Sequence, residues 1–171
     1  MTGIEIKQSA ENYIDEFIDD PEAVTAINRA LSLIGDMALI YEEVEIEALE
    51  QRKWYPLPPT TTNVRAVEDA WGNPYYEFRV RDNLISFDDA GTYNVFYRRL
   101  PKSITGILDT PEVHPAYHQV LVTYLIGWWK LKDDDENPDG LRNMQQFEQD
   151  TLRVFNTLRR TRGPKSIEVV R

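Results

Sequence analysis

Residues 1–40 contain two runs in which apolar side chains recur every three or four positions, as on the buried face of a helix. The apolar stripe of the first run is Ile6, Ala10, Tyr13, Ile14, Phe17 and Ile18. The stripe of the second run is Val24, Ile27, Leu31, Ile34 and Ala38. Between them, Asp19 and Pro21 provide an N-cap and a proline at the first helical position. We therefore expect a helical hairpin over residues 1–40.

Between residues 41 and 100 the pattern changes to a period of two. The segment from Glu43 to Glu47 alternates acidic and apolar side chains, which is typical of a strand with one face in water. Further strand-like segments flank the turns at 70–74 and 88–91, so two hairpins are expected. The proline-rich segment 55–62 cannot lie within a central strand. This region predicts an antiparallel sheet of four or five strands.

Helical spacing returns after Pro101. Residues 116–132 are apolar almost all round, which predicts a buried, central helix. An acidic turn at 133–140 precedes a last amphipathic helix, which basic residues close and Gly163 ends. The order of these elements predicts an α+β fold. We expect an antiparallel four-helix bundle, with two N-terminal and two C-terminal helices, an inserted antiparallel β-sheet module and an extended C-terminal arm.

The expected organisation is one α+β domain over residues 1–162, followed by the C-terminal arm at 163–171. Within the domain we expect a helical hairpin at 1–40, the β-module at 41–100 and a second helical hairpin at 101–162. The 171 residues are enough to bury a substantial core without a metal or a disulfide. The chain has no cysteine, which excludes disulfides and thiol chemistry and fits a reducing compartment.

Neither a membrane nor export is expected for this chain. The N-terminal residues have no basic segment followed by an apolar one, so no secretory signal is predicted. The longest apolar run, VLVTYLIGWW, is too short to cross a bilayer. We expect a soluble protein that is made in a cytoplasm.

The formal charge of −10 is unevenly distributed along the chain. Residues 1–50 carry thirteen acidic and two basic side chains, whereas residues 153–171 carry six basic and one acidic. The net charge argues against tight binding of nucleic acid, which requires concentrated Lys and Arg. The asymmetry has two interpretations of about equal weight. It indicates either solubility with a solvated tail, or head-to-tail attraction between the basic end of one copy and an acidic face of another.

A calcium site is the first candidate chemistry, because Asp135, Asn137, Asp139 and Gly140 match the start of an EF-hand loop. The position that needs a bidentate glutamate holds Gln146 instead. The simpler interpretation, which we prefer, is an acidic turn in which Asn137 or Asp139 caps the last helix.

Histidines and carboxylates offer no better site. His114 and His118 have helical spacing, but Pro115 puts His114 at the helix edge and no third ligand is near, so packing or capping roles are favoured. Paired acids such as Asp88 and Asp89 fall in turns or on polar strand faces, without an apolar pocket to shift their pKa. We expect no enzyme, no cofactor and no metal.

Aromatic side chains at strand ends and turns are candidates for binding a partner. Trp71, Asn73 and Tyr75 lie at the expected hairpin turn, where exposed aromatics stack on sugars or anchor protein interfaces. Trp128 and Trp129 lie on the expected central helix, where ordinary packing is favoured. This pattern keeps open a carbohydrate- or surface-binding module as an alternative function.

Residues 92–132 contain the strand-like run TYNVFYRRLPK, the segment ILDTP and the helix start HPAYHQVLVTYL. A strand that ends in Tyr-x-x-x-Pro, an Asp-x-Pro segment and a Leu-rich helix in this order resemble the adaptor proteins of tailed bacteriophages. The resemblance extends to the two N-terminal helices, the inserted β-module, the acidic break and the last helix with its basic tail. Its motifs are framework residues and include no active site.

The resemblance implies a structural virion protein of the neck, made in the cytoplasm of a bacterial host. Such subunits dock as a ring, commonly of about twelve copies, beneath the portal protein. They extend the channel through which genomic DNA passes without sequence-specific binding, and they present a platform for the next neck or tail protein. Another tail-completion protein is a related alternative. The resemblance assigns portal or neighbour binding to Arg159, Arg160, Arg162, Lys165, Ile167, Val169, Val170 and Arg171.

Overall fold

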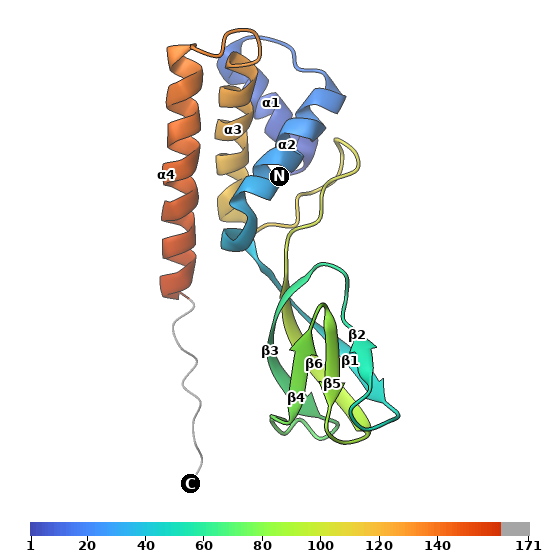
Figure 1. Cartoon of the computed structure of the whole chain (residues 1–171). Coiled ribbons are helices and arrows are strands. Elements are labelled where there is room, and N and C mark those ends of the chain that lie inside the picture. The colour runs from blue at the N-terminus through green and yellow to red at the C-terminus, as the bar shows by residue number, and fades with distance from the viewer. Residues whose placement is uncertain (162–171) are drawn as a thin grey trace. The chain divides into compact units, whose positions relative to one another are not determined.

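The computed structural model of the chain describes the backbone of residues 1–161 and the side chains of residues 1–159 (Figure 1). The helices of this part are α1 (Gly3–Ile14), α2 (Asp20–Ile34), α3 (His118–Lys130) and α4 (Pro138–Thr161), with short 3-10 turns η1 (Gly35–Ala38) and η2 (Pro115–Tyr117). The strands are β1 (Ile40–Ala48), β2 (Trp54–Pro56), β3 (Thr61–Asp69), β4 (Phe78–Arg81), β5 (Leu84–Phe87) and β6 (Gly91–Arg99).

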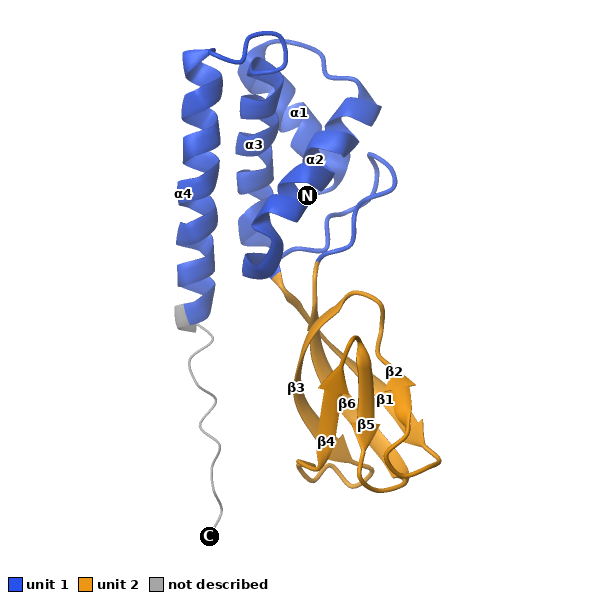
Figure 2. Cartoon of the chain, in the orientation of Figure 1, with its two compact units in different colours: residues 1–38, 101–171 blue, residues 39–100 orange. Residues whose placement is uncertain are grey.

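The chain divides into two compact units (Figure 2). The helical unit comprises Met1–Ala38 and the described residues from Pro101 onward, and the β-unit comprises Leu39–Leu100. The borders lie close to the points where the sequence changes its period, near Tyr41 and Pro101.

Helix α3 is the centre of the helical unit, with α4 on one side and the α1–α2 pair on the other (Figure 1). Its buried residues are His118, Val120, Leu121, Val122, Tyr124, Leu125, Ile126 and Gly127. Burying one Val, Leu or Ile side chain contributes about 1.5–3 kcal/mol, so covering this helix is a large part of the unit's stability. The ring of Tyr124 meets that of Phe147 on α4 edge-on, with 4.9 Å between centroids.

Two glycines allow α3 and α4 to approach closely. A Cβ atom at Gly140 would stand 2.7 Å from Cγ of Leu131, and one at Gly127 would stand 3.0 Å from Sδ of Met144. Both distances are shorter than carbon and sulfur atoms normally allow. Larger residues at these positions would require the side chains of Leu131 and Met144 to shift, so the two glycines allow the present separation of the helices.

The β-unit consists of two three-stranded antiparallel sheets, with strand orders β1-β6-β3 and β2-β5-β4. Their inner faces share one apolar core, in which Phe87 of β5 and Tyr93 of β6 stack with centroids 4.1 Å apart and ring planes at 5°. Tyr55 and Tyr75 add tilted contacts to the ring of Phe87. The two layers are held together chiefly by this aromatic cluster.

The expected four-helix bundle with one inserted sheet is wrong. The chain is α+β with four helices and two three-stranded antiparallel sheets, and the strands stand between the helices in the sequence. Helix α3 is apolar all round, and α1, α2 and α4 each pack on it. Helix α4 otherwise contacts the short 3-10 turns, so the four helices are not arranged around a common axis. The strands of three or four residues, β2, β4 and β5, form a second layer over the long strands β1, β3 and β6.

Replacing Phe87 with Ala is expected to destabilise the β-unit by about 3–5 kcal/mol, because it removes a fully buried ring from between the two sheets. Native-state hydrogen exchange checks this by the protection of amides in β5 and β6. The matched control is Tyr76→Ala, at a ring that is 81% exposed, where the change is expected to stay within about 0.5 kcal/mol. Equal loss of protection in both variants would contradict the assignment of Phe87 to the core.

Candidate interaction surfaces

The α1–α2 connection and the α3–α4 turn lie at the same end of the helical unit (Figure 1). Trp129 Nε1 donates a hydrogen bond of 2.7 Å to Glu16 Oε2, and the ammonium of Lys132 pairs with Glu22, so the two connections are tied together. We call this the acidic end. Its acidic residues are Asp15, Glu16, Asp19, Asp20, Glu22, Asp133, Asp134, Asp135, Glu136 and Asp139.

Exposed aromatic rings lie beside these acids. Tyr13 and Phe17 are 62% and 70% exposed. The ammonium of Lys7 lies 4.4 Å from the centroid of Phe17, and that of Lys130 lies 5.9 Å from the centroid of Tyr13. Cations above ring faces are an attractive arrangement. The acidic end therefore combines carboxylates with rings that already contact positive charge.

Lys7 anchors the start of α2 to α1 at this end. Its buried ammonium lies 2.5 Å from Oδ1 of Asp20 and 3.6 Å from Oε1 of Glu11. Burial disfavours the charged form, but the hydrogen bond to Asp20 and the nearby carboxylates outweigh it, so the pKa of Lys7 is raised. The same Glu11 oxygen accepts a 2.9 Å hydrogen bond from the backbone of Ile18. This lysine is part of the framework.

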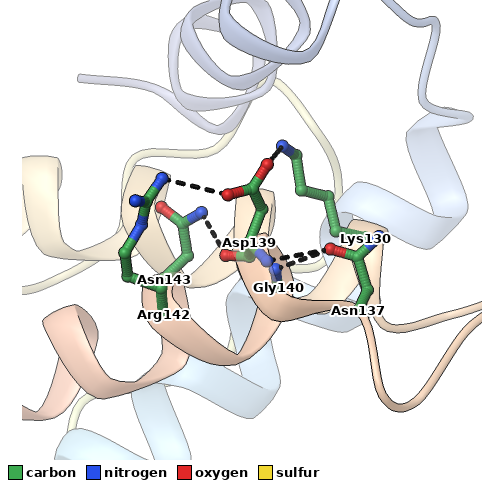
Figure 3. A network of polar contacts seen from close by, with 6 residues as sticks. All are labelled: Lys130, Asn137, Asp139, Gly140, Arg142 and Asn143. Carbon is green, nitrogen blue, oxygen red and sulfur yellow. Dashed lines mark hydrogen bonds and ion pairs between the residues drawn. The ribbon is translucent and has the colours of Figure 1, made fainter.

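The start of α4 resolves the EF-hand-like motif (Figure 3). Oδ1 of Asn137 accepts hydrogen bonds from the backbone N–H groups of Asp139 and Gly140, at 3.1 and 3.0 Å. The carboxylate of Asp139 pairs with Lys130 at 3.4 Å and with Arg142 at 3.0 Å. The preferred interpretation, a capped helix start, is confirmed. Asn137 and Asp139, two of the side chains that an EF-hand loop would use as calcium ligands, are therefore already bound to other groups.

The arm residues assigned to portal binding lie mostly beyond the part that can be described. Arg159 is exposed near the end of α4. The side chain of Arg160 and all of Arg162, Lys165, Ile167, Val169, Val170 and Arg171 lie outside the described residues. Helix α4 has 24 residues and rises about 1.5 Å per residue, so it carries the start of this basic segment roughly 36 Å from the acidic end.

A groove of about 430 Å³ runs between the first turns of α3 and the last third of α4. Val120, Val154 and Leu158 give it an apolar floor, and Asp150 and Arg153 stand at its rim. Leu152, which is 51% exposed, lies on the neighbouring flank of α4. The groove is a second surface on which another chain can be accommodated.

The two histidines are packing and capping residues. Nδ1 of His114 accepts a 3.2 Å hydrogen bond from the backbone of Ala116 at the start of η2. His118 is buried, and its Nδ1 lies 2.7 Å from the N-terminal nitrogen of Met1. Burial, followed by the positive charge of that nitrogen, lowers the pKa of His118. His114 therefore caps η2, and His118 is packed within the helical unit.

The hairpin residues singled out in the sequence have three different environments. Trp71 is 85% exposed. Asn73 donates its backbone and side-chain N–H groups to the carboxylate of Asp69, and these bonds, the largest causes of the shift, hold the pKa of that carboxyl below its usual range. Tyr75 belongs to the aromatic core, with its ring 4.6 Å from that of Tyr93. The exposed tyrosine is its neighbour Tyr76.

No protein-family model matches the chain, and no curated protein matches it. Within residues 1–161, no helix is both long and apolar enough to span a membrane. The same residues contain no group of three or more His, Cys, Asp or Glu side chains arranged to hold a metal ion.

Replacing Asn137 with Ala is expected to lower the free energy of unfolding by about 0.5–2 kcal/mol, because two N–H groups at the start of α4 lose their acceptor. Chemical denaturation measures the change, and Gln149→Ala, at an exposed site within the same helix, is the matched control. Millimolar calcium is expected to leave the unfolding midpoint of the native chain unchanged. A calcium-dependent rise that Asn137→Ala abolishes would instead restore the EF-hand interpretation.

Proposed function

We propose that this chain is a structural subunit of a tailed-bacteriophage virion, a head-to-tail adaptor of the neck. In this role copies of the chain form a ring, of about twelve subunits by the resemblance described above, beneath the portal protein. The ring extends the DNA channel and joins the capsid to the next neck or tail protein. The chain is made in the cytoplasm of the bacterial host and acts in the virion.

The charge polarity of the helical unit is the observation that carries this proposal. The acidic end and the start of the basic C-terminal segment are separated by the length of α4. Opposite charges at separate places on one subunit attract the unlike parts of neighbouring copies. The arrangement therefore favours joining one molecule to the next.

The acidity of the chain also suits a conduit for DNA. A negatively charged wall repels the phosphate backbone and does not hold it. Tight binding would instead require clustered Lys and Arg side chains. The basic side chains of the C-terminal segment are clustered in residues 153–171 of the sequence, which fits attachment to a protein partner better than lining a channel.

The proposal assigns no catalytic role to the chain. The carboxyls with lowered pKa serve turns: the hydroxyl of Thr105, followed by backbone N–H groups of Gly106 and Thr105, lowers the pKa of Asp109. The buried Arg99 pairs with Glu42 at 2.6 Å, and the hydroxyl of Tyr97 donates to the other oxygen of Glu42 at 2.9 Å. These groups are occupied in holding the backbone and the strands β1 and β6 together.

Deleting residues 160–171 is expected to leave the fold intact and to weaken docking to portal rings by about tenfold or more, equivalent to roughly 1.4 kcal/mol. Co-sedimentation of purified chain with portal rings measures docking, and far-UV circular dichroism checks the fold. A full-length control with Arg160, Arg162, Lys165 and Arg171 changed to Gln separates charge from length. Undiminished co-sedimentation of the truncated chain would remove the arm from the proposal.

A carbohydrate- or surface-binding module remains the second candidate function, and one observation favours it. Trp71 and Tyr76 are 85% and 81% exposed in the connection between β3 and β4. Exposed aromatic rings stack on sugar faces and anchor protein interfaces. The two rings are the most exposed large apolar side chains among the described residues.

On this alternative, the chain binds glycans on an array, and Trp71→Ala or Tyr76→Ala abolishes the signal. Tyr13→Ala, which removes an exposed ring from the helical unit, is the matched control and is expected to leave binding unchanged. A native chain that binds no glycan at millimolar ligand rules this alternative out.

A further inference from the structure

The β-unit has an outer face of strongly negative character on the sheet β1-β6-β3. Val44, Ile46 and Ala48 of β1 point into the core. Successive side chains of a strand alternate between faces, so the glutamates between and before them point outward. The register places Glu68 of β3 across Asn94 from Glu45. We call this surface the acidic face; its members are Glu43, Glu45, Glu47 and Glu68.

No ion pair within the described residues neutralises the glutamates of the acidic face. Among the described residues, none of its four glutamates makes an ion pair or a side-chain hydrogen bond. Arg65 lines the same hollow as Glu43 at one end of this face. Arg98 lies across from Tyr41 in the register and donates a hydrogen bond to its hydroxyl.

The opposite sheet, β2-β5-β4, has an outer face of the other sign. Tyr55 and Phe78 pack inward, so their strand neighbours Trp54 and Arg79 point outward. Arg81 follows on the same face two residues later. We call Trp54, Arg79 and Arg81 the basic face. The register places Trp54 and Arg79 on either side of Ser86, and Arg81 lies across from Leu84.

The two arginines of the basic face are available to a partner. Arg79 makes no ion pair among the described residues. Arg81 pairs with Asp82 at 3.0 Å, but both side chains are about four-fifths exposed, at 78% and 80%. Exposed pairs of this kind contribute about 0–1 kcal/mol and exchange readily.

The spacing of charge on the two faces matches. Residues two apart on a strand are separated by about 6.8 Å, so Arg79 and Arg81 have the same spacing as Glu45 and Glu47. The exposed indole of Trp54 has a counterpart in Phe96, which is half-buried in the acidic face next to Glu43. Each face thus carries a pair of like charges and an aromatic ring.

We propose that the acidic face of one copy of this chain docks on the basic face of a second copy. Because the two faces belong to opposite layers of one compact unit, each copy offers one face to each of two neighbours. Such heterologous contacts close into rings or extend into filaments. The inference deepens the proposed function by naming the surfaces through which copies join, and it rests on that function only for the closed ring.

The size of the faces predicts a weak contact. The nine-residue strands of the acidic face span about 30 Å, but the strands of the basic face have three or four residues and span only about 10–14 Å. With three strands spanning roughly 14 Å, the basic face limits the contact to on the order of 200 Å² per copy. This is below the size of stable protein interfaces, so association is expected to be transient unless several contacts act together. The copies also repel through their net charge of −10. Salt of about 0.1 M screens that repulsion beyond roughly 10 Å and leaves direct pairs largely in place.

Charge reversal on each face tests the proposal with the purified chain in about 0.1 M salt. The first variant carries Glu45→Lys and Glu47→Lys, and the second carries Arg79→Glu and Arg81→Glu. A fourfold variant carries all four changes, so it keeps the native net charge and inverts both faces. A control with Asp36→Lys and Glu148→Lys changes the net charge as the first variant does, at exposed positions in the helical unit outside the acidic end. Circular dichroism checks that each variant is folded.

Sedimentation velocity over a concentration series measures self-association. The native chain, the fourfold variant and the Asp36/Glu148 control are expected to increase in average mass with concentration. Each two-residue face variant is expected to associate at least about tenfold more weakly, and an equimolar mixture of the two is expected to associate again, because their faces are complementary. A native chain that stays monomeric throughout, or folded variants that associate as the native chain does, overturns the proposal.

The same proteins distinguish this inference from the proposed function. Docking to portal rings is measured separately, and it depends on the C-terminal segment. Self-association through the two faces without any binding to portal rings leaves the inference standing and removes the adaptor role. Binding to portal rings by folded face variants at native strength, as single copies, removes the inference and leaves the adaptor role.

Discussion

Helix α3 is apolar on almost every side, so exposing any of them to water would cost free energy. The other helices are arranged so that they cover it. Val122 and Ile126 on one side and Leu121 and Leu125 on another are all buried, so no single neighbour suffices. The α1–α2 pair covers one side and α4 covers the other. The position of the acidic end follows from this arrangement. The α1–α2 connection and the α3–α4 turn lie at the same end of the helical unit, and both carry acidic residues.

Much of the helical unit could be predicted because its signals are local. The all-round apolar pattern of residues 116–132 indicated a buried helix, and α3 lies there. Asn137 followed the ordinary chemistry of a helix start, so its capping role could be recognised from the turn sequence. The prediction of an antiparallel four-helix bundle was wrong because periodicity shows which face of a helix is apolar and does not show which neighbour covers it.

The two-layer arrangement of the β-unit could not be predicted from the sequence. Alternation identifies the buried face of a strand, but strands of three or four residues, such as β2 and β4, contain too few positions to show in which layer they lie. The same limit explains Tyr75 and Tyr76. Adjacent residues point to opposite sides, and only the contacts with Phe87 and Tyr93 show that Tyr75 is the inward one. The charges of the two outer faces became visible once the layers were known.

The close contact of α3 with α4 has a geometric consequence for anything attached to the end of α4. Gly127 of α3 faces the Met144 side chain of α4, and Gly140 of α4 faces Leu131 after α3; both contacts are close because glycine has no Cβ. A slip of α4 by one residue would move it about 1.5 Å along its axis, rotate it by 100° and present a side chain where the glycine stood. Helix α4 therefore keeps a fixed register against α3. In every copy, the segment that follows Thr161 starts at the same distance from the acidic end, whatever that segment then binds.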